Sequence, residues 1–260
     1  MDCKILKYPI FSELDGIVHG ASTRMGGVSG GYFSSMNLGL GTDDDISNVR
    51  KNWEIFCSAA GIDINKTVCA AQTHTDNIRY VTEKDCGKGI VTARDYNDVD
   101  ALVTNEHGIA LCVFSADCIP VLFADAKEGA IGAAHCGWRG TYKELAAKTV
   151  FEMQKLFGCR PENIKAAVGA GIHKCCYEVD EKLYSDFKEN FGGAVNAFSV
   201  RDGRFYLDLP EINKYVLLNA GLAPENIYVS DLCTCCNKDT LFSHRGSHGK
   251  RGLMVNFIQM

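Results

Sequence analysis

The sequence is poor in proline, with five in 260 residues, and contains no stretch rich in proline, glycine or serine that would act as a linker. It lacks a run of about 18 apolar residues, which argues against a membrane-spanning helix. It also lacks an excess of basic residues: the net charge is −5, which argues against a nucleic-acid partner. The length lies near the upper limit for one hydrophobic core, so we predict a single domain over residues 1–260.

Cysteine, by contrast, is abundant, with 13 residues. The first ten residues, MDCKILKYPI, show neither a long apolar run nor a cleavage-site pattern, so we expect a cytoplasmic protein with reduced thiols. Cys57, Cys69 and Cys112 lie in apolar runs and are expected to pack as small hydrophobic side chains. A second group would bind a structural metal only if the fold gathered it, because its adjacent cysteines are unlike the usual spaced pairs. This group consists of Cys175, Cys176, Cys233, Cys235 and Cys236.

A unit of helix, glycine, short loop and strand occurs three times. Apolar spacings of three and four predict helices near residues 47–60, 141–157 and 210–220, each followed by a glycine. Thr141 and Glu144 form a capping-box pattern that predicts the start of the second helix. The tetrapeptide Pro-Glu-Asn-Ile follows both the second and the third helix and leads into a strand. This repeat is either a common helix-to-strand loop or a coincidence.

The centre of the chain is rich in short apolar segments. Residues 100–104, 109–115, 119–124 and 129–134 are each predicted to form a buried strand. Strands that alternate with amphipathic helices are typical of an α/β protein. We therefore predict mixed β-sheets with helices packed outside them.

Three polar segments lie where predicted strands end, the first after a strand near residues 67–71, and they contain His74, Cys118 and His135 as a candidate ligand set. In layered α/β proteins, ligands collect at strand ends and in the loops beyond them. Two histidines and a cysteine are ligands that zinc prefers and that copper also accepts. Three protein ligands leave a fourth position open, as in catalytic sites. The alternatives are hydrogen-bonded histidines near strand ends and a buried structural thiol.

Eight segments occur in the order of a known family: Ser22–Ser29, Asn37–Gly39, Gln72–His74, Val99–Thr104, Ala116–Val121, His135–Gly140, Cys176–Val179 and Phe242–Arg245. Together they resemble the laccase-domain family, which is also described as multicopper polyphenol oxidoreductase-like, as purine nucleoside phosphorylase and as peptidoglycan editing factor. The resemblance extends from about Gly20 to Arg251, which is nearly the whole chain. Departures are Cys136 where the family often has alanine, Ala170 in place of proline, and Gly246 in place of a second arginine.

The resemblance implies a layered sandwich similar to that of some cysteine hydrolases. It implies that His74, Cys118 and His135 are both the metal ligands and the catalytic residues, with zinc as the expected metal and copper as the alternative. It also implies purine nucleosides and phosphate as substrates. Members of the family phosphorolyse adenosine, inosine, guanosine and 5′-methylthioadenosine, and they deaminate adenosine.

Four further residues are predicted to contact the substrate: Arg24, Gln72, Arg139 and Arg245. Arg139 precedes the helix predicted to start at Thr141, and an arginine beside a helix N-terminus favours a bound anion. Arg24 lies in a glycine-rich loop, and Arg245 belongs to a basic C-terminal stretch that includes Arg251. Asp117 is either a proton shuttle or a structural aspartate at a strand end.

Two other functions suit the same residues. Cys118 as nucleophile with His135 as base would give a metal-free amide hydrolase, which fits the description of some relatives as peptidoglycan editing factors. Copper-dependent oxidation of phenols is the other function, but it is expected to need more copper ligands than one three-residue site supplies. No sequence pattern sets the oligomeric state.

Overall fold

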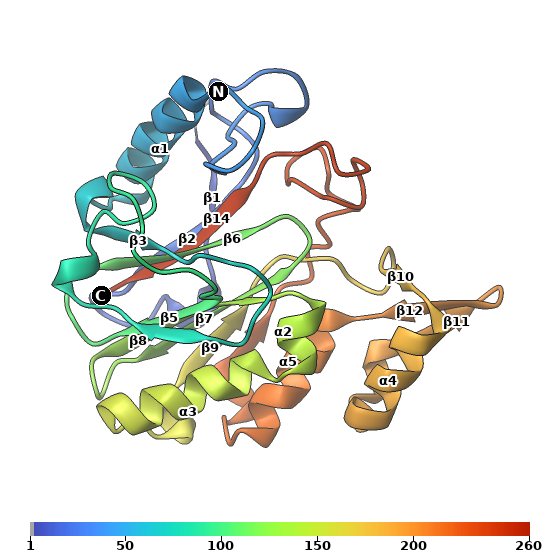
Figure 1. The fold of residues 1–260 in the computed structure, drawn as a ribbon. Coiled ribbons are helices and arrows are strands. Elements are labelled where there is room, and N and C mark those ends of the chain that lie inside the picture. Colours follow the sequence, from blue (N-terminus) through green and yellow to red (C-terminus); the bar gives the residue numbers. More distant parts are fainter. Residues whose placement is uncertain (1–2) are drawn as a thin grey trace.

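Two β-sheets pack face to face, and helices cover both outer faces, which gives an α/β/β/α sandwich (Figure 1). The structure, a computed structural model, describes residues 3–260. This architecture confirms the predicted α/β class with mixed sheets and external helices. Within residues 3–260, no helix has the length and apolar character needed to cross a bilayer.

The first sheet has the strand order β1-β2-β14-β6-β3. Its strands are β1 (Ile5–Leu6), β2 (Val18–Ser22), β3 (Thr67–Cys69), β6 (Ala110–Ser115) and β14 (Met254–Gln259). Only the pairing of β3 with β6 is parallel. Helix α1 (Ile46–Ala60) covers the outer face through Trp53 and Phe56, which pack against Phe257.

The second sheet has the order β13-β9-β7-β8-β5-β4. Its strands are β4 (Ile78–Tyr80), β5 (Ala101–Thr104), β7 (Ile119–Asp125), β8 (Ala130–Cys136), β9 (Lys165–Val168) and β13 (Ile227–Val229). Helices α2 (Trp138–Tyr142), α3 (Leu145–Phe157) and α5 (Leu209–Asn219) lie on its outer side (Figure 1). Side chains alternate along β7: Val121 and Phe123 face these helices, whereas Leu122 and Ala124 face the first sheet.

A small lobe projects from the sandwich at the lower right of Figure 1. It consists of the antiparallel strands β10 (Glu178–Val179), β11 (Phe198–Arg201) and β12 (Arg204–Leu207), with helix α4 (Glu181–Phe191) packed on them. Short 3-10 helices complete the chain: Pro9–Phe11, Gly31–Phe33, Ile64–Lys66, Glu83–Asp85, Pro161–Asn163, Val195–Ala197 and Pro224–Asn226.

The three helix-to-strand units are confirmed. Each of the helices α1, α3 and α5 is followed by a 3-10 turn and then by β3, β9 or β13. The two Pro-Glu-Asn-Ile segments adopt the same 3-10 turn, and the strands that follow them pair in parallel. The repeat is therefore a helix-to-strand loop used twice. The cysteines predicted to be core residues, Cys57, Cys69 and Cys112, are buried.

The predicted capping box is wrong. The polypeptide becomes helical earlier, at Trp138, with Gly137 as the N-cap, so Thr141 lies inside α2. The Thr141 hydroxyl donates to the carbonyl of Cys136 instead of capping the helix. Glu144 adopts a left-handed conformation with φ of 57° between α2 and α3, and its side chain makes no capping hydrogen bond.

Candidate metal centre and adjoining pockets

Three neighbouring strands place the site at one end of the second sheet. Strand β8 runs antiparallel to both β7 and β5. The end of β8, with His135, therefore lies beside the residues that precede β7 and β5, which are Cys118 and Asp100. His74 arrives from the loop that connects β3 of the first sheet to β4 of the second.

His74, Cys118 and His135 form a compact cluster. One potential ligand atom from each lies within 4.8 Å of the other two. The Cys118 Sγ lies 3.8 Å from Nε2 of His74, and the two imidazole rings are 5.0 Å apart. His135 is buried, Cys118 is partly buried and His74 is exposed, so the cluster opens toward solvent on the His74 side.

Asp100 holds two of these three residues in place. The buried carboxylate lies 2.8 Å from Nδ1 of His135 and also accepts the backbone N–H groups of Thr73, His74 and Thr75. Because a carboxylate can only accept, Nδ1 of His135 donates and Nε2 is left free for a metal. Sequence reasoning missed Asp100. The available signals were an acidic residue at the start of an apolar strand and its place in the family motif Val99–Thr104.

Gly137 leaves the space that the cluster needs. A Cβ atom at this position would lie 2.9 Å from Cδ2 of His74 and 3.0 Å from Sγ of Cys118. The backbone of Gly137 is extended, so any residue type is sterically possible there apart from this contact. Two nitrogen donors, one sulfur donor and an open space between them fit a zinc or copper ion.

Without a metal, the charges in the cluster pair a Cys118 thiolate with a protonated His135, so an ion bound at Nε2 would have to displace a proton. Burial alone would raise the pKa of the Cys118 thiol, but the charge of His135 and hydrogen bonds from both histidines lower it to about 6. Burial alone would lower the pKa of His135, but Cys118 and Asp100 raise it to about 9. The thiol therefore ionises readily, and a thiolate is the form that binds metals.

Asp117, next to Cys118, has both carboxylate oxygens engaged. One accepts the hydroxyl of Thr234 and the other accepts the backbone N–H of Arg245, each at 2.6 Å. The residue adopts a φ of 95°, a conformation that L-residues rarely take and that these two bonds stabilise. This arrangement supports a structural aspartate that orients Cys118.

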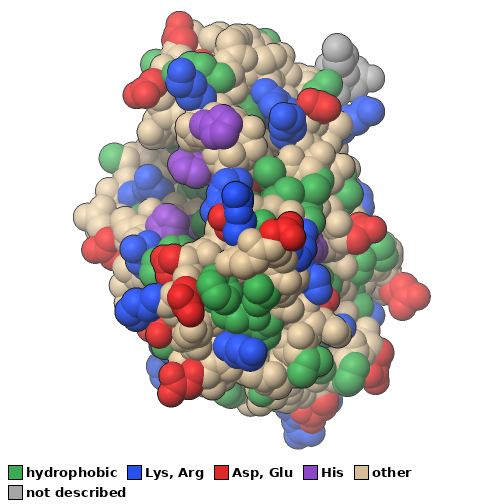
Figure 2. Space-filling model, turned by 90° about the vertical axis from the view of Figure 1, so that its right-hand side faces the viewer, with side chains coloured by type: hydrophobic (Ala, Val, Ile, Leu, Met, Phe, Trp, Pro, Cys, Tyr) green, Lys and Arg blue, Asp and Glu red, His purple; other side chains and the backbone are tan. Residues whose placement is uncertain are grey.

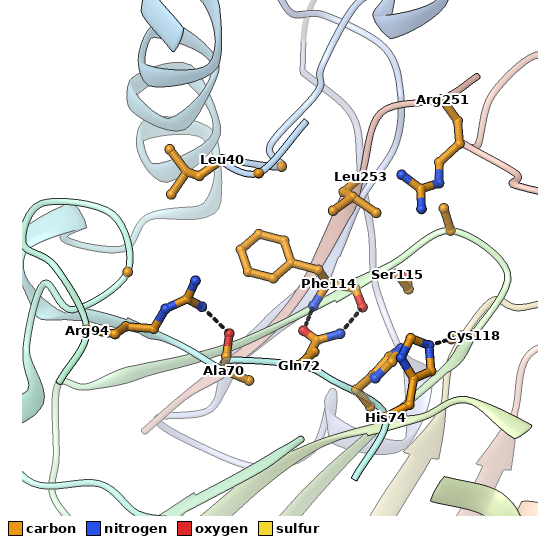
Figure 3. A pocket seen from close by; sticks show the side chains of 15 residues that line it. Leu40, Ala70, Gln72, His74, Arg94, Phe114, Ser115, Cys118, Arg251 and Leu253 are labelled. Atoms are coloured by element: carbon orange, nitrogen blue, oxygen red, sulfur yellow. Dashed lines mark hydrogen bonds between the residues drawn. The ribbon is translucent and has the colours of Figure 1, made fainter. Parts of the chain in front are cut away.

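Two pockets meet at the cluster, with His74, Cys118 and Arg251 in the lining of both. The first measures about 320 Å³ and contains Gln72, Arg94, Phe114 and Leu253 (Figure 3). The second measures about 380 Å³, and its lining includes Trp138, Tyr177, His244 and Arg245. Both volumes lie in the range of small-molecule sites. Histidine, lysine and arginine side chains gather along a hollow on one side of the molecule (Figure 2).

The predicted substrate residues are spread over three places. Gln72 lines the first pocket, but its side-chain amide forms two hydrogen bonds with the backbone of Phe114, at 2.6 and 2.8 Å. Arg245 lines the second pocket and donates to the carbonyls of Cys176 and Glu178. Both side chains therefore also shape the pocket walls.

Arg139 and Arg24 lie elsewhere. Arg139 stacks over its neighbour Trp138, with its guanidinium 4.2 Å from the ring centre, and it is absent from the lining of both pockets. Arg24 donates to the carbonyls of Ser34 and Lys238 in a separate pocket. The expected anion site at a helix starting at Thr141 also loses its basis, because α2 begins three residues earlier and is only 5 residues long.

Arg251 is the basic residue that the structure places at the junction of the pockets. Figure 3 shows its guanidinium reaching from the segment before β14 toward the side of the pocket that holds Cys118 and His74. Its Nε is buried and has no hydrogen-bond partner among the described residues. A guanidinium that lines a pocket and has an unpartnered buried N–H is suited to a bound anion.

The fold and the site define a layered α/β protein with a three-residue cluster of candidate metal ligands between two pockets. A family model described as "Multi-copper polyphenol oxidoreductase laccase" matches residues 18–260. The chain belongs to this laccase-domain family, as its motifs predicted.

Individual relatives cover almost the whole chain. Purine nucleoside phosphorylase YlmD of Bacillus subtilis is 35% identical over 249 residues, which are 94% of this chain and 88% of the relative. Adenosine deaminase RL5, from an unknown prokaryotic organism, is 32% identical over 239 residues, or 88% of each chain. The crystal structure of the Bacillus licheniformis hypothetical protein YfiH matches with a TM-score of 0.90 at 34% identity, over 95% of this chain and 94% of that one.

Proposed function

We propose that this protein is a metal-dependent purine nucleoside phosphorylase that also deaminates adenosine. The names of the relatives, a phosphorylase and a deaminase, support both activities. The observation that carries the proposal is the partnerless guanidinium of Arg251, which lines both pockets beside the His74–Cys118–His135 cluster. Adenosine, inosine, guanosine and 5′-methylthioadenosine are the proposed nucleosides.

His74, Cys118 and His135 would hold the metal, for which we propose zinc, with copper as the alternative. When bound there, such an ion supplies Lewis-acid chemistry toward water or a polar substrate atom. Asp100 fixes the orientation of His135 and of the His74 loop, and it keeps the proton of His135 on Nδ1. The side chains of the cluster are thus held in position before the metal binds, which limits the conformational entropy lost on metal binding.

Arg251 and Arg245 would position phosphate in the second pocket, where both line the wall. In phosphorolysis, a phosphate oxygen bonds to C1′ of the ribose, and the C1′–N9 bond breaks with its electron pair leaving on the purine. The departing purine then takes up a proton at a ring nitrogen. The attacking hydrogen phosphate supplies this proton by way of solvent, and His244, which lines the second pocket, would contact the phosphate.

The first pocket would accommodate the nucleoside. Phe114, Leu40 and Leu253 provide apolar contact area, and Arg94 borders the opposite end (Figure 3). Apolar walls with a few polar groups are typical of pockets that bind flat heterocycles. Gln72 would act by holding Phe114 in position through its two backbone hydrogen bonds.

Product identification with adenosine tests the proposal. Without phosphate, the zinc-loaded protein should release inosine and ammonia. With phosphate, it should also release adenine and ribose 1-phosphate. Cys118→Ser serves as the control for a contaminating enzyme and should abolish both reactions. Neither product appearing with the zinc-loaded protein would refute the proposal.

A second candidate function is that of a thiol hydrolase. In this reading Cys118 is the nucleophile, His135 is the base and Asp100 orients the base. The low pKa of Cys118 and the bond between His135 and Asp100 favour it. Metal content separates the two functions. A metal-free protein whose amide hydrolysis is abolished by thiol alkylation would support the hydrolase, whereas one metal ion at the cluster supports the phosphorylase.

A further inference from the structure

A second cluster of sulfur atoms lies outside the site described above. The thiol groups of Cys175, Cys176, Cys233 and Cys236 all lie within 4.8 Å of one another. The Cys236 Sγ is 3.5 Å from that of Cys175 and 3.4 Å from that of Cys176. All four are free thiols, so no disulfide holds them together.

The sheet explains why cysteines that are 60 residues apart meet. Strands β9 and β13 are parallel neighbours, so their carboxyl ends lie at the same edge of the second sheet. An additional bridge between Gly171 and Cys233 continues this pairing beyond the strands. The loop after β9 then carries Cys175 and Cys176, and the loop after β13 carries Cys233 and Cys236.

The geometry points to a tetrahedral zinc site, and we propose that these four cysteines bind a structural Zn²⁺. Zinc–sulfur bonds of about 2.3 Å require sulfurs about 3.8 Å apart at the corners of a tetrahedron. The observed separations of 3.4 and 3.5 Å and the 4.8 Å limit bracket that value. Soft thiolates select zinc over harder cations, and four protein ligands leave no open position for substrate.

The surroundings favour the negative charge of such a centre. Backbone N–H groups of His173 and Cys236 lie near the sulfur of Cys233. The guanidinium of Arg201 lies against the same loop and donates to the carbonyls of Lys174 and Cys175. N–H donors and a nearby cation are the usual partners of metal-bound thiolates.

The ion would fasten two loops that form one wall of the second pocket. Tyr177, which lines that pocket, directly follows Cys176. Thr234, which follows Cys233, donates to Asp117 beside the ligand Cys118. Arg245 spans the two loops by donating to the carbonyl of Cys176. A structural metal here would therefore fix the pocket wall without touching the substrate.

Zinc counting by mass spectrometry of the metal, after purification in reductant without chelator, tests the proposal. The unmodified protein should contain about two zinc ions per chain, since the His74 site and the tetracysteine site each hold one. Cys236→Ser should lose one of the two, and so should Cys118→Ser. Cys235→Ser is the matched control, because Cys235 adjoins the cluster but is not part of it, and it should keep both.

Cobalt substitution assigns each ion to its site. Thiolate-to-cobalt absorption grows with the number of sulfur ligands, so Cys118→Ser should retain most of it and Cys236→Ser should lose most of it. A single zinc in the unmodified protein that Cys236→Ser leaves in place would overturn the proposal. A disulfide at Cys236 that is present with or without chelator would also overturn the proposal. It would be detected as an intact mass that is lower by two hydrogens.

The measurement on the unmodified protein does not depend on whether a variant folds. It is also separate from the proposed enzymatic function. An inactive protein with two zinc ions would refute the phosphorylase but not the tetracysteine site, and an active protein whose single zinc ion persists in Cys236→Ser would do the reverse.

Discussion

The Asp100 carboxylate lies 2.8 Å from Nδ1 of His135, and its two oxygens also hold the backbone of the loop that carries His74. One buried side chain thereby sets the positions of two proposed metal ligands, His135 at the end of β8 and His74 in the loop between β3 and β4. Its pKa is lowered: burial would raise it, but the bonds from His135 and the Thr75 backbone outweigh burial.

We predict that Asp100→Asn lowers zinc affinity by roughly 10- to 100-fold, the usual cost of losing a partner of a ligating histidine. An amide has one acceptor oxygen in place of two. Its NH₂ group would face N–H donors of His135 and of the loop that carries His74. Competition with a zinc chelator measures the change. Asp98→Asn is the matched control, since Asp98 is exposed and binds the Thr73 hydroxyl. Unchanged affinity in Asp100→Asn would show that the carboxylate has only a structural role.

Gly137→Ala should expel the metal while leaving the fold intact. The added methyl would lie 2.9 Å from the His74 ring and 3.0 Å from the Cys118 sulfur, so the ligands must separate. The extended backbone of Gly137 tolerates alanine, and we expect the melting temperature of the metal-free protein to change by no more than a few degrees. Gly30→Ala, where the methyl meets nothing within 4 Å, should bind zinc normally. Full zinc occupancy in Gly137→Ala would contradict the placement of the metal.

Arg251→Met should separate the two proposed activities. Loss of the guanidinium should raise the KM for phosphate in inosine phosphorolysis by about tenfold or more, which corresponds to one charge-assisted hydrogen bond. Adenosine deamination uses water and should largely survive. Lys250→Met, which removes an exposed neighbouring charge, is the control.

Arg139→Met decides between the two arginines. Because Arg139 lies outside the lining of both pockets, we expect its phosphate KM to remain close to that of the unmodified protein. A large rise in Arg139→Met with none in Arg251→Met would reinstate the assignment made from the sequence.

His19 should make stability depend on pH. Burial, followed by the charge of Lys7, lowers the pKa of His19 from 6.5 to about 4. The unfolded chain therefore takes up a proton that the folded protein resists, and the His19 contribution to stability is lost as pH falls from about 6.5 to 4. Urea unfolding at both ends of this window should show that the free energy of unfolding declines as pH falls. The decline should be smaller by roughly 1–3 kcal/mol in His19→Gln than in the unmodified protein. Equal declines in the two proteins would contradict the shift.

Short sequence patterns predicted the elements that neighbouring residues determine. The helix-to-strand turns at Pro161 and Pro224 and the glycine after α1 follow from side-chain chemistry over a few residues. Strand β14 gave no comparable signal. It gains its stability from pairing with β2, more than 230 residues away, and with β6.

The residues of the site also divide into those that the sequence indicated and those that only the structure places there. His74, Cys118 and His135 stood out because they are metal-ligand types at the ends of predicted strands and within the family motifs, and the fold gathers them. Asp100 and Arg251 matter through position alone. Asp100 was only one residue of a family motif and Arg251 only one of several candidate arginines, and the tertiary structure places both beside the cluster.

The central position of β14 has a consequence for the order in which the protein matures. A ribosome-bound chain that has emerged only to residue 253 can form the second sheet, but β2 and β6 remain without the strand that belongs between them. Two unpaired strand edges on an apolar layer are prone to association with other chains. Arg251 would be fixed in the pocket only when β14 inserts, so completion of the sheet and acquisition of the anion site coincide. Until β14 is in place, the chain has neither a complete first sheet nor the part of the pocket wall that Arg251 forms.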